Sequence, residues 1–204
     1  MLEGGKLTVK DILETILHRR AIRRFDTARQ IDEDALQKIL QAGLYAPSAG
    51  GRQGPLLVVC QDAEVNARLG RIKRANSHPR MAAGGNYVSK DQPSIADDPT
   101  LTNAFYDAPT VITLFGPKNF LFAAEDCACA AENMMLAADA LGIGSCYIGQ
   151  GWPAFADPYG QKILRQWGIP AGYYAVMQLL LGYPRPGDRH PEPKPRREGR
   201  VLRF

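Results

Sequence analysis

The chain has 204 residues, of which 45% are hydrophobic and 23% are charged, and its formal net charge is +4. These values fit one domain spanning residues 1–204, and the charge is too small to indicate a nucleic-acid partner by itself. No apolar run of about 18 residues is present, which excludes a membrane-spanning helix. The N-terminal residues lack the apolar core and cleavage site of a signal peptide, so we expect a cytoplasmic protein.

The first 60 residues predict two helices and a strand. Residues 8–11 resemble a capping box, and apolar residues at helical spacing continue to about residue 20. Asp32 can cap a second helix, which ends before Pro47 because the residue preceding a proline avoids the α region. Residues 56–60 (LLVVC) form a continuous apolar run, which is typical of a strand buried on both faces.

The middle of the chain contains the longest predicted helix. A weak helix over residues 63–73 precedes residues 74–100, which show little periodicity and predict a loop, often a functional feature at this length. Residues 110–115 predict a second strand. Residues 120–141 then predict a helix that is apolar nearly all round and therefore buried. In a chain of this size, we expect a partner subunit to cover one of its faces.

The remaining elements complete an α+β pattern. Residues 145–148 and 173–181 predict strands, with a helix over residues 158–167 between them. We expect helices to pack over both faces of a central sheet. From residue 183 onward, prolines forbid a helix and favour an extended arm over residues 183–204. This arm is either a disordered tail or a segment whose apolar end docks onto a sheet edge, including that of a partner subunit.

The charged and sulfur-containing residues leave two interpretations open. Arginines concentrate in residues 19–24 and 185–203, and these clusters are either solvated surface charge or two halves of one anion site. None of the four cysteines lies in a CxxC motif or near zinc-type histidines, so we predict no metal site and no disulfide. The three histidines, His18, His78 and His190, are isolated in the sequence and are expected at the surface.

Four motifs together resemble those of the nitroreductase family. Residues 19–25 (RRAIRRF) resemble its arginine-rich flavin mononucleotide (FMN) motif, RRSxRxF, and residues 46–53 (APSAGGRQ) are similar to its APSxxNxQPW loop. Residues 130–149 resemble its dimer helix and flavin-facing strand, and residues 181–197 resemble its C-terminal signature. The motifs keep their order over residues 10–204, and no dinucleotide or Walker motif competes. The resemblance implies a mostly antiparallel sheet, a long buried dimer helix and a C-terminal arm.

The resemblance also implies a flavin site shared by two subunits of a homodimer. Arg19 and Arg196, with Lys194 alongside, would bind the FMN phosphate, for which the forked guanidinium is suited. Arg23 would lie near the pyrimidine edge, where a positive charge stabilises reduced flavin. The other implied flavin contacts within the same chain are Arg20, Ala21, Tyr147, Ile148 and Gly149. The backbone N–H of Gly149 would point at flavin N5. The partner subunit would contribute Pro47, Ser48, Ala49 and Gly51 of its own loop.

The implied activity is an oxidoreductase that passes a hydride from NADH or NADPH through flavin N5 to a nitroaromatic or quinone acceptor by a ping-pong mechanism. The flavin carries the redox step, so we name no catalytic residue, and Cys146 lacks a nearby activating base. Ala21, Gly51 and Gly54 depart from the family pattern and would alter flavin affinity.

Other functions stay open because residues 74–106 match no subgroup. These are dehalogenation, flavin cleavage or dehydrogenation on the same scaffold, flavin binding without NAD(P)H turnover, and nucleic-acid binding by the basic ends. In the same segment, Tyr87, Phe105 and Tyr106 either stack over the ring or belong to the core.

Overall fold

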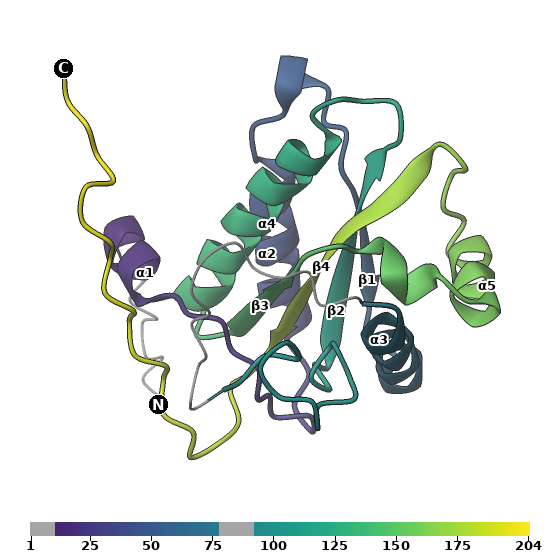
Figure 1. Ribbon diagram of the computed structural model, residues 1–204, viewed down its shortest axis with the longest axis horizontal. Coiled ribbons are helices and arrows are strands. Elements are labelled where there is room, and N and C mark those ends of the chain that lie inside the picture. Colours follow the sequence, from purple (N-terminus) through teal and green to yellow (C-terminus); the bar gives the residue numbers. More distant parts are fainter. Residues whose placement is uncertain (1–10, 78–91) are drawn as a thin grey trace, which may run out of the picture.

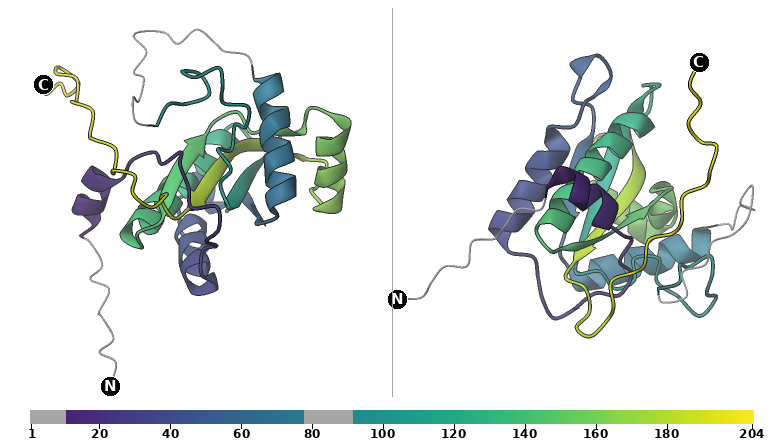
Figure 2. Two further views of the ribbon diagram at one scale, coloured as in Figure 1. Left: turned by 90° about the horizontal axis from the view of Figure 1, so that it is seen from below. Right: turned by 90° about the vertical axis from the view of Figure 1, so that its left-hand side faces the viewer.

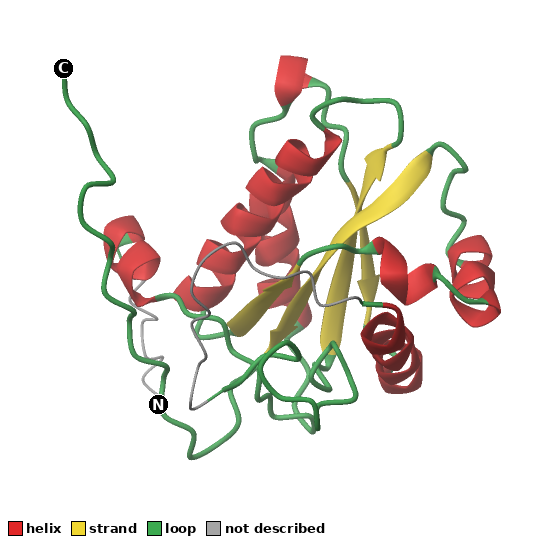
Figure 3. Cartoon of the chain, viewed as in Figure 1, coloured by secondary structure: helices red, strands yellow, loops and turns green. Residues whose placement is uncertain are grey.

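The computed structural model of the chain describes residues 11–77 and 92–204, and its centre is one antiparallel sheet (Figure 1). The strand order is β1-β2-β4-β3, and each neighbouring pair is antiparallel. Helices surround the sheet on both sides (Figure 3). The strands are β1 (Leu56–Cys60), β2 (Thr110–Pro117), β3 (Gly144–Ile148) and β4 (Tyr173–Gly182).

Several helices begin at an aspartate whose side chain caps them. The carboxylate of Asp62 accepts from the backbone N–H groups of Glu64 and Val65, and that of Asp157 accepts from Gly160. The helices are α1 (Ile12–His18), α2 (Glu33–Leu44), α3 (Ala63–Asn76), α4 (Ala123–Ala140) and α5 (Pro158–Gln166), with short 3₁₀ helices η1 (Ala49–Gly51) and η2 (Trp152–Phe155). No helix in the described part of the chain is both long and apolar enough to cross a bilayer.

Two hydrophobic clusters lie on the two faces of the sheet. Side chains alternate between faces along a strand, so Ile112 and Leu114 of β2 pack towards α2 and α4, whereas Val111 and Phe115 pack towards α3, η2 and α5. Figure 2 shows this layered arrangement from two further sides. The predicted α+β fold with an antiparallel sheet and helices on both faces is therefore confirmed.

The position of β1 corrects one expectation. Residues 56–60 form the predicted strand, but β1 lies at an edge of the sheet, and its first four residues are only half-buried. Side chains on both of its faces contact the two clusters, which explains the continuous apolar run. At this edge, the outer side of β1 has no strand neighbour among residues 11–77 and 92–204.

Helix α4 is buried on most but not all of its surface. Its sheet-facing residues include Cys127, Ala131, Met134 and Ala138, all fully buried. Cys129 instead is exposed. The outer face of α4 is therefore open among the described residues, and the partner subunit expected to cover it stays a prediction.

Helix α1 presents its apolar side chains to solvent. Its N-cap is Asp11, whose carboxylate accepts from the Leu13 N–H, and residues 8–10 of the predicted capping box lie outside the described residues. Ile12, Leu13, Ile16 and Leu17 are all exposed, Leu17 by 74%. The spacing of these residues predicted the helix correctly, and none of the four belongs to either hydrophobic cluster of the described residues.

The segment after α3 is irregular where it is described. Helix α3 extends to Asn76, three residues beyond the predicted end, and residues 78–91, with His78 and Tyr87, lie outside the described residues. Residues 92–108 return across α3, where the Ala104 N–H donates to the Gly70 carbonyl at 3.1 Å. Phe105 is a core residue with 1% exposure, so it does not lie over a ligand.

Gly70 provides a test of this packing. A Cβ on Gly70 would lie 1.7 Å from Oδ1 of Asn103, so Gly70→Ala forces the 92–108 segment away from α3. We expect it to lower the free energy of unfolding by about 1–3 kcal/mol, as overpacking does. Gly172→Ala is the control, because a Cβ there meets nothing within 4 Å. If denaturant titrations show the same decrease in the free energy of unfolding for Gly70→Ala and Gly172→Ala, close packing at Gly70 is not the cause.

Candidate functional site

The outer edge of β3 is covered only at its beginning. Ala21 forms a parallel bridge with Ser145, and the Ile22 N–H donates to the Ser145 carbonyl at 2.9 Å. No other bridge joins the described residues to this side of β3, which is the last strand of the sheet. The backbone from Cys146 to Ile148 therefore forms an edge without a strand neighbour in the described residues, next to the arginine-rich motif.

Arg23 is held beside this edge by the segment that follows α3. Its backbone N–H donates to Oε1 of Gln92 at 2.5 Å, and its Nη1 donates to the Gln92 carbonyl at 3.0 Å. The guanidinium also lies 6.0 Å from the ring centre of Tyr106, whose hydroxyl accepts from the Ile95 N–H. Burial raises the pKa of Tyr106, so its hydroxyl stays neutral beside the cation. Tyr106 thus packs against a predicted site residue.

Unused hydrogen-bonding atoms gather near the beginning of β3. Nη1 of Arg20 donates to the Arg19 carbonyl at 2.7 Å. The Nε atoms of Arg20 and Arg23 and the hydroxyl of Ser145 are buried without a partner among the described residues. Buried donors of this kind are costly unless a ligand or another group satisfies them. The cluster fits an anionic ligand along the strand edge.

Cys146 is buried at this edge, and its thiol is unreactive. Burial raises the pKa of its thiol to about 11, against smaller lowering effects from the charges of Arg23 and Arg19. The thiolate is the nucleophilic form, so a thiol with this pKa is unreactive near neutral pH. This agrees with the view that Cys146 is not a nucleophile. The described residues contain no cluster of three or more His, Cys, Asp or Glu side chains that could hold a metal ion.

The loop after β3 is held from below by a buried lysine. Lys73 of α3 is only 2% exposed, and its Nζ donates to the Gly149 carbonyl at 2.9 Å and also to the Gln150 carbonyl. Burial lowers the pKa of Lys73 to about 7. A buried cation under the end of β3 was not predicted from the sequence.

Gly151 joins the same loop to β4 by hydrogen bonds. Its N–H donates to the Val176 carbonyl at 2.7 Å, and its carbonyl accepts from Nε2 of Gln178 at 2.9 Å. A Cβ on Gly151 would lie 2.7 Å from the Met177 nitrogen, so only glycine fits. Gly149 differs, because a Cβ there would meet only the Tyr147 ring at 3.8 Å. Packing within the chain does not require glycine at 149, which leaves that space open to a ligand.

The loop of residues 46–53 is anchored to the first turn of α4. The Ala49 N–H donates to Oδ1 of Asp126 at 2.9 Å, and the hydroxyl of Ser48 accepts from the Gln53 N–H. Gly51 has a φ of +65°, a region that glycine and asparagine tolerate best. Gly51 in place of the family's asparagine is therefore compatible with the same loop. Pro47, Ser48 and Asp126 line a pocket of about 90 Å³ next to it.

His18 and His190 form a cluster, which corrects the expectation that they are isolated. Nδ1 of His18 lies 2.9 Å from a carboxylate oxygen of Asp139 near the end of α4, and the two imidazoles stack at 4.1 Å. Nε2 of His190 lies 2.9 Å from the His18 carbonyl. Both residues are at the surface, as expected, but they fasten the residues beside Arg19 to α4 and to the C-terminal segment.

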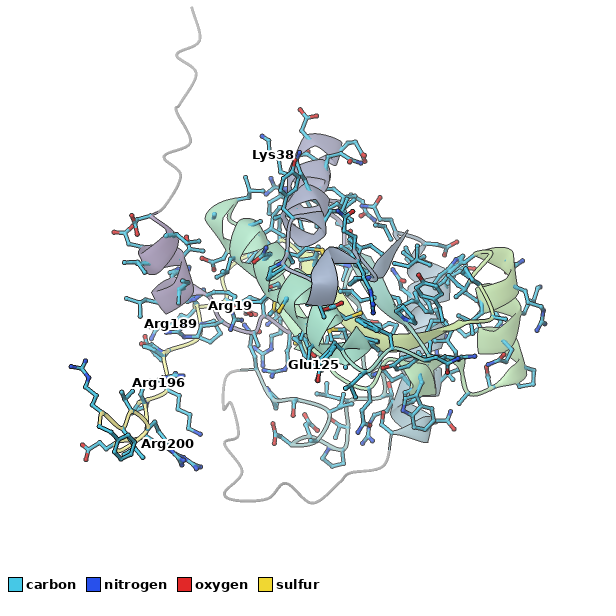
Figure 4. All side chains as sticks on the ribbon, turned by 90° about the horizontal axis from the view of Figure 1, so that it is seen from above. Arg19, Lys38, Glu125, Arg189, Arg196 and Arg200 are labelled. Atoms are coloured by element: carbon cyan, nitrogen blue, oxygen red, sulfur yellow. The ribbon has the colours of Figure 1, made fainter. Side chains whose placement is uncertain are left out.

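Arg196, the predicted phosphate ligand in the C-terminal basic cluster, does not lie beside Arg19 (Figure 4). In Figure 4, Arg189 lies next to Arg19, whereas Arg196 and Arg200 lie further out along the chain. Arg196 is exposed, and its guanidinium donates to the Lys194 carbonyl through two nitrogens. The loop of residues 46–53 is also remote, because η1 stands at the opposite end of α4 from α1 (Figure 1).

The antiparallel sheet with helices on both faces, and an arginine-rich segment beside its β3 edge, defines an α+β protein with a cationic sheet edge. The chain belongs to the nitroreductase family, whose model matches residues 16–183. It is 31% identical over 95% of its length to the NADPH-flavin oxidoreductase of Vibrio harveyi, covering 73% of that protein. It also resembles a Bacteroides fragilis nitroreductase structure with bound FMN, with 30% identity, a TM-score of 0.77 and coverage of 96% of this chain and 99% of the other.

Three residues of the site were missed by the sequence analysis. Lys73 follows Asn66, Leu69 and Gly70 on the buried stripe of α3, so a lysine at a core position was an available signal. Asp126 was similarly visible as an acid within the apolar run of α4. Gln92 gave no signal, since it lies in a segment without periodicity.

The lowered pKa of Lys73 predicts a pH dependence of stability. Between pH 7 and 10.5 the unfolded chain binds a proton at Lys73 that the folded chain does not, so the free energy of unfolding rises with pH. Below pH 7 both states are protonated and the cost of burying the charge is fully present. We expect wild-type protein to gain up to a few kcal/mol relative to Lys73→Met between pH 6 and 9. If the free energies of unfolding of wild type and Lys73→Met, measured by denaturant titration, change in parallel with pH, Lys73 does not become neutral in the folded protein.

Proposed function

We propose that this chain is an FMN-dependent NAD(P)H oxidoreductase whose acceptors are nitroaromatic or quinone-type molecules. The observation that carries the proposal is the cationic edge of β3, in a chain 30% identical to a solved nitroreductase with bound FMN. When bound, FMN supplies hydride acceptance and donation at N5, so nicotinamide and acceptor use the same position in turn.

The arginine-rich motif would bind the polar parts of FMN. Arg19 carries the phosphate, and Arg20 and Ala21 contact the flavin beside it. Arg23, which Gln92 holds in place, provides a positive charge for the pyrimidine edge. The buried Nε atoms of Arg20 and Arg23, unpartnered in the described chain, support this assignment because a ligand would satisfy them.

The end of β3 would carry the reactive edge. Tyr147, Ile148 and Gly149 lie at the unpaired edge, and the space next to Gly149 supports close approach by a flat ring. The protonated thiol of Cys146 supports a mechanism in which no side chain acts as nucleophile. The task of this chain is then to bind and orient FMN, the nicotinamide and the acceptor.

A second copy of the chain would complete the site. The exposed apolar residues of α1 and a cavity of about 470 Å³ between α1, α2 and α4, lined by Ile12, Ala42 and Leu136, support a homodimer. In this arrangement Pro47, Ser48, Ala49 and Gly51 line the flavin of the partner. The arm of residues 183–204 docks on the dimer and brings Lys194 and Arg196 to the phosphate.

The first test is the visible spectrum of the purified protein with FMN, before and after anaerobic addition of NADH or NADPH. We expect flavin peaks that bleach with at least one nucleotide and return with a nitroaromatic, a quinone or free flavin. Arg19→Ala with Arg196→Ala should weaken FMN binding at least tenfold, because charge-assisted hydrogen bonds to the phosphate are lost. Fluorescence quenching measures the affinity.

The control is Arg71→Ala with Arg165→Ala, which removes two exposed arginines from α3 and α5. This variant should bind FMN as wild type does. Equal affinity in both double variants would refute the phosphate assignment, and a wild-type protein that binds no FMN would refute the proposed function itself.

The homodimer has its own test at α1. Leu17 is 74% exposed in one chain, so Leu17→Glu should leave the fold of each subunit intact. We expect it to convert a dimer to a monomer in sedimentation velocity, because a charge would be buried without a partner in the interface. Gln166→Glu adds the same charge on α5 and should stay dimeric. A wild-type monomer would overturn the shared-site arrangement.

A further inference from the structure

Lys73 occupies a position that a lysine seldom takes. It lies on the core side of α3, and its ammonium is directed towards the loop after β3 rather than to solvent. Burying a charged side chain is costly unless hydrogen bonds compensate for the lost water. The carbonyl oxygens of Gly149 and Gln150 are the compensating groups, so one cation binds two successive peptides.

These two contacts determine which way the Gly149–Gln150 peptide faces. The chain has no cis peptide bond among the described residues, and in a trans peptide the C=O and N–H groups point in opposite directions. The Gly149 carbonyl points inward to Lys73, so the N–H of Gln150 points outward. Gly149 and Gln150 are exposed on that outer side, whereas Gly151 is buried.

The backbone at Gln150 needs such support. Its φ of +55° lies in the left-handed region, which costs about 1 kcal/mol or more for a residue with a side chain. Lys73 holds the carbonyls on both sides of this residue's Cα, and Gly151 is fixed to β4 by its own hydrogen bond to Val176. The left-handed turn is therefore clamped from the core and from the sheet.

We propose that Lys73 is a positioning residue that clamps the Gly149–Gln150 peptide so that its N–H is presented outward to the ligand at the end of β3. The inference rests on the proposed function, since the ligand there is the flavin. Lys73 does not touch the ligand and acts through the peptide. A hydrogen bond accepted by the carbonyl oxygen also polarises the peptide, which strengthens the outward N–H as a donor.

The first experiment uses protein without FMN and compares Lys73→Met with wild type by hydrogen–deuterium exchange. Methionine has a similar length but donates no hydrogen bond, so both carbonyls are released. We expect the buried amide of Gly151, which donates to the Val176 carbonyl, to exchange about tenfold faster or more, because losing at least one buried hydrogen bond loosens the loop. The matched control is Lys118→Met, because exposed Lys118 also donates to a backbone carbonyl, that of Ala171 at 2.7 Å.

The second measurement is the affinity for added FMN and the reduction potential of the bound flavin. We expect Lys73→Met to bind FMN about tenfold more weakly and to shift the potential, whereas Lys118→Met matches wild type in both. A merely structural lysine would lower stability without moving the potential. Lys73→Gln keeps a donor on a shorter side chain, and we expect its exchange rate to lie between those of wild type and Lys73→Met.

The outcomes separate this inference from the proposed function. If wild-type protein binds FMN and Lys73→Met keeps wild-type exchange at Gly151, affinity and potential, the positioning role is wrong and the proposed function stands. If wild-type protein binds no FMN, the proposed function fails, and the exchange comparison still decides whether Lys73 clamps the loop. Should Lys73→Met not fold, unchanged exchange in Lys73→Gln overturns the inference.

Discussion

The structure of the site depends on the backbone contact made by the outer edge of β3. One backbone hydrogen bond, from Ile22 to Ser145, covers the beginning of this edge and leaves the rest without a strand neighbour in the described residues. Open sheet edges are usually protected, since their backbone groups need partners. Here the bridge also places the arginine-rich motif beside the open part. The same interaction thus joins the N-terminal segment to the sheet and brings cations to a backbone that can accept a ligand.

Buried polar groups position the surroundings of this edge. Gln92 fixes Arg23, Lys73 holds the loop after β3, and Asp126 holds the loop of residues 46–53. Each contact joins segments far apart in the sequence, and each buries a polar group whose partners must be correct for the fold to form. The side chains that support the site are therefore buried ones, and each joins the site to a different part of the chain.

The sequence predicted the elements well because each has a strong local pattern. The strand of residues 56–60 has the bounds that were predicted, and the capped helices lie within a few residues of theirs. The family was also predicted from four motifs in order, and the match over residues 16–183 confirms it. The expected burial of β1 on both faces was less successful, since an apolar run shows that side chains are apolar but not how completely they are covered.

Helix propensity, strand patterning and the arginine-rich motif are thus determined by the sequence alone, because they depend on neighbours along the chain. The tertiary structure decided the partners of the isolated polar residues. Lys73 meets two carbonyls some 76 and 77 residues away, and His18 meets Asp139 across 121 residues. Such contacts arise only when the sheet order brings distant segments together, and no local pattern encodes that order.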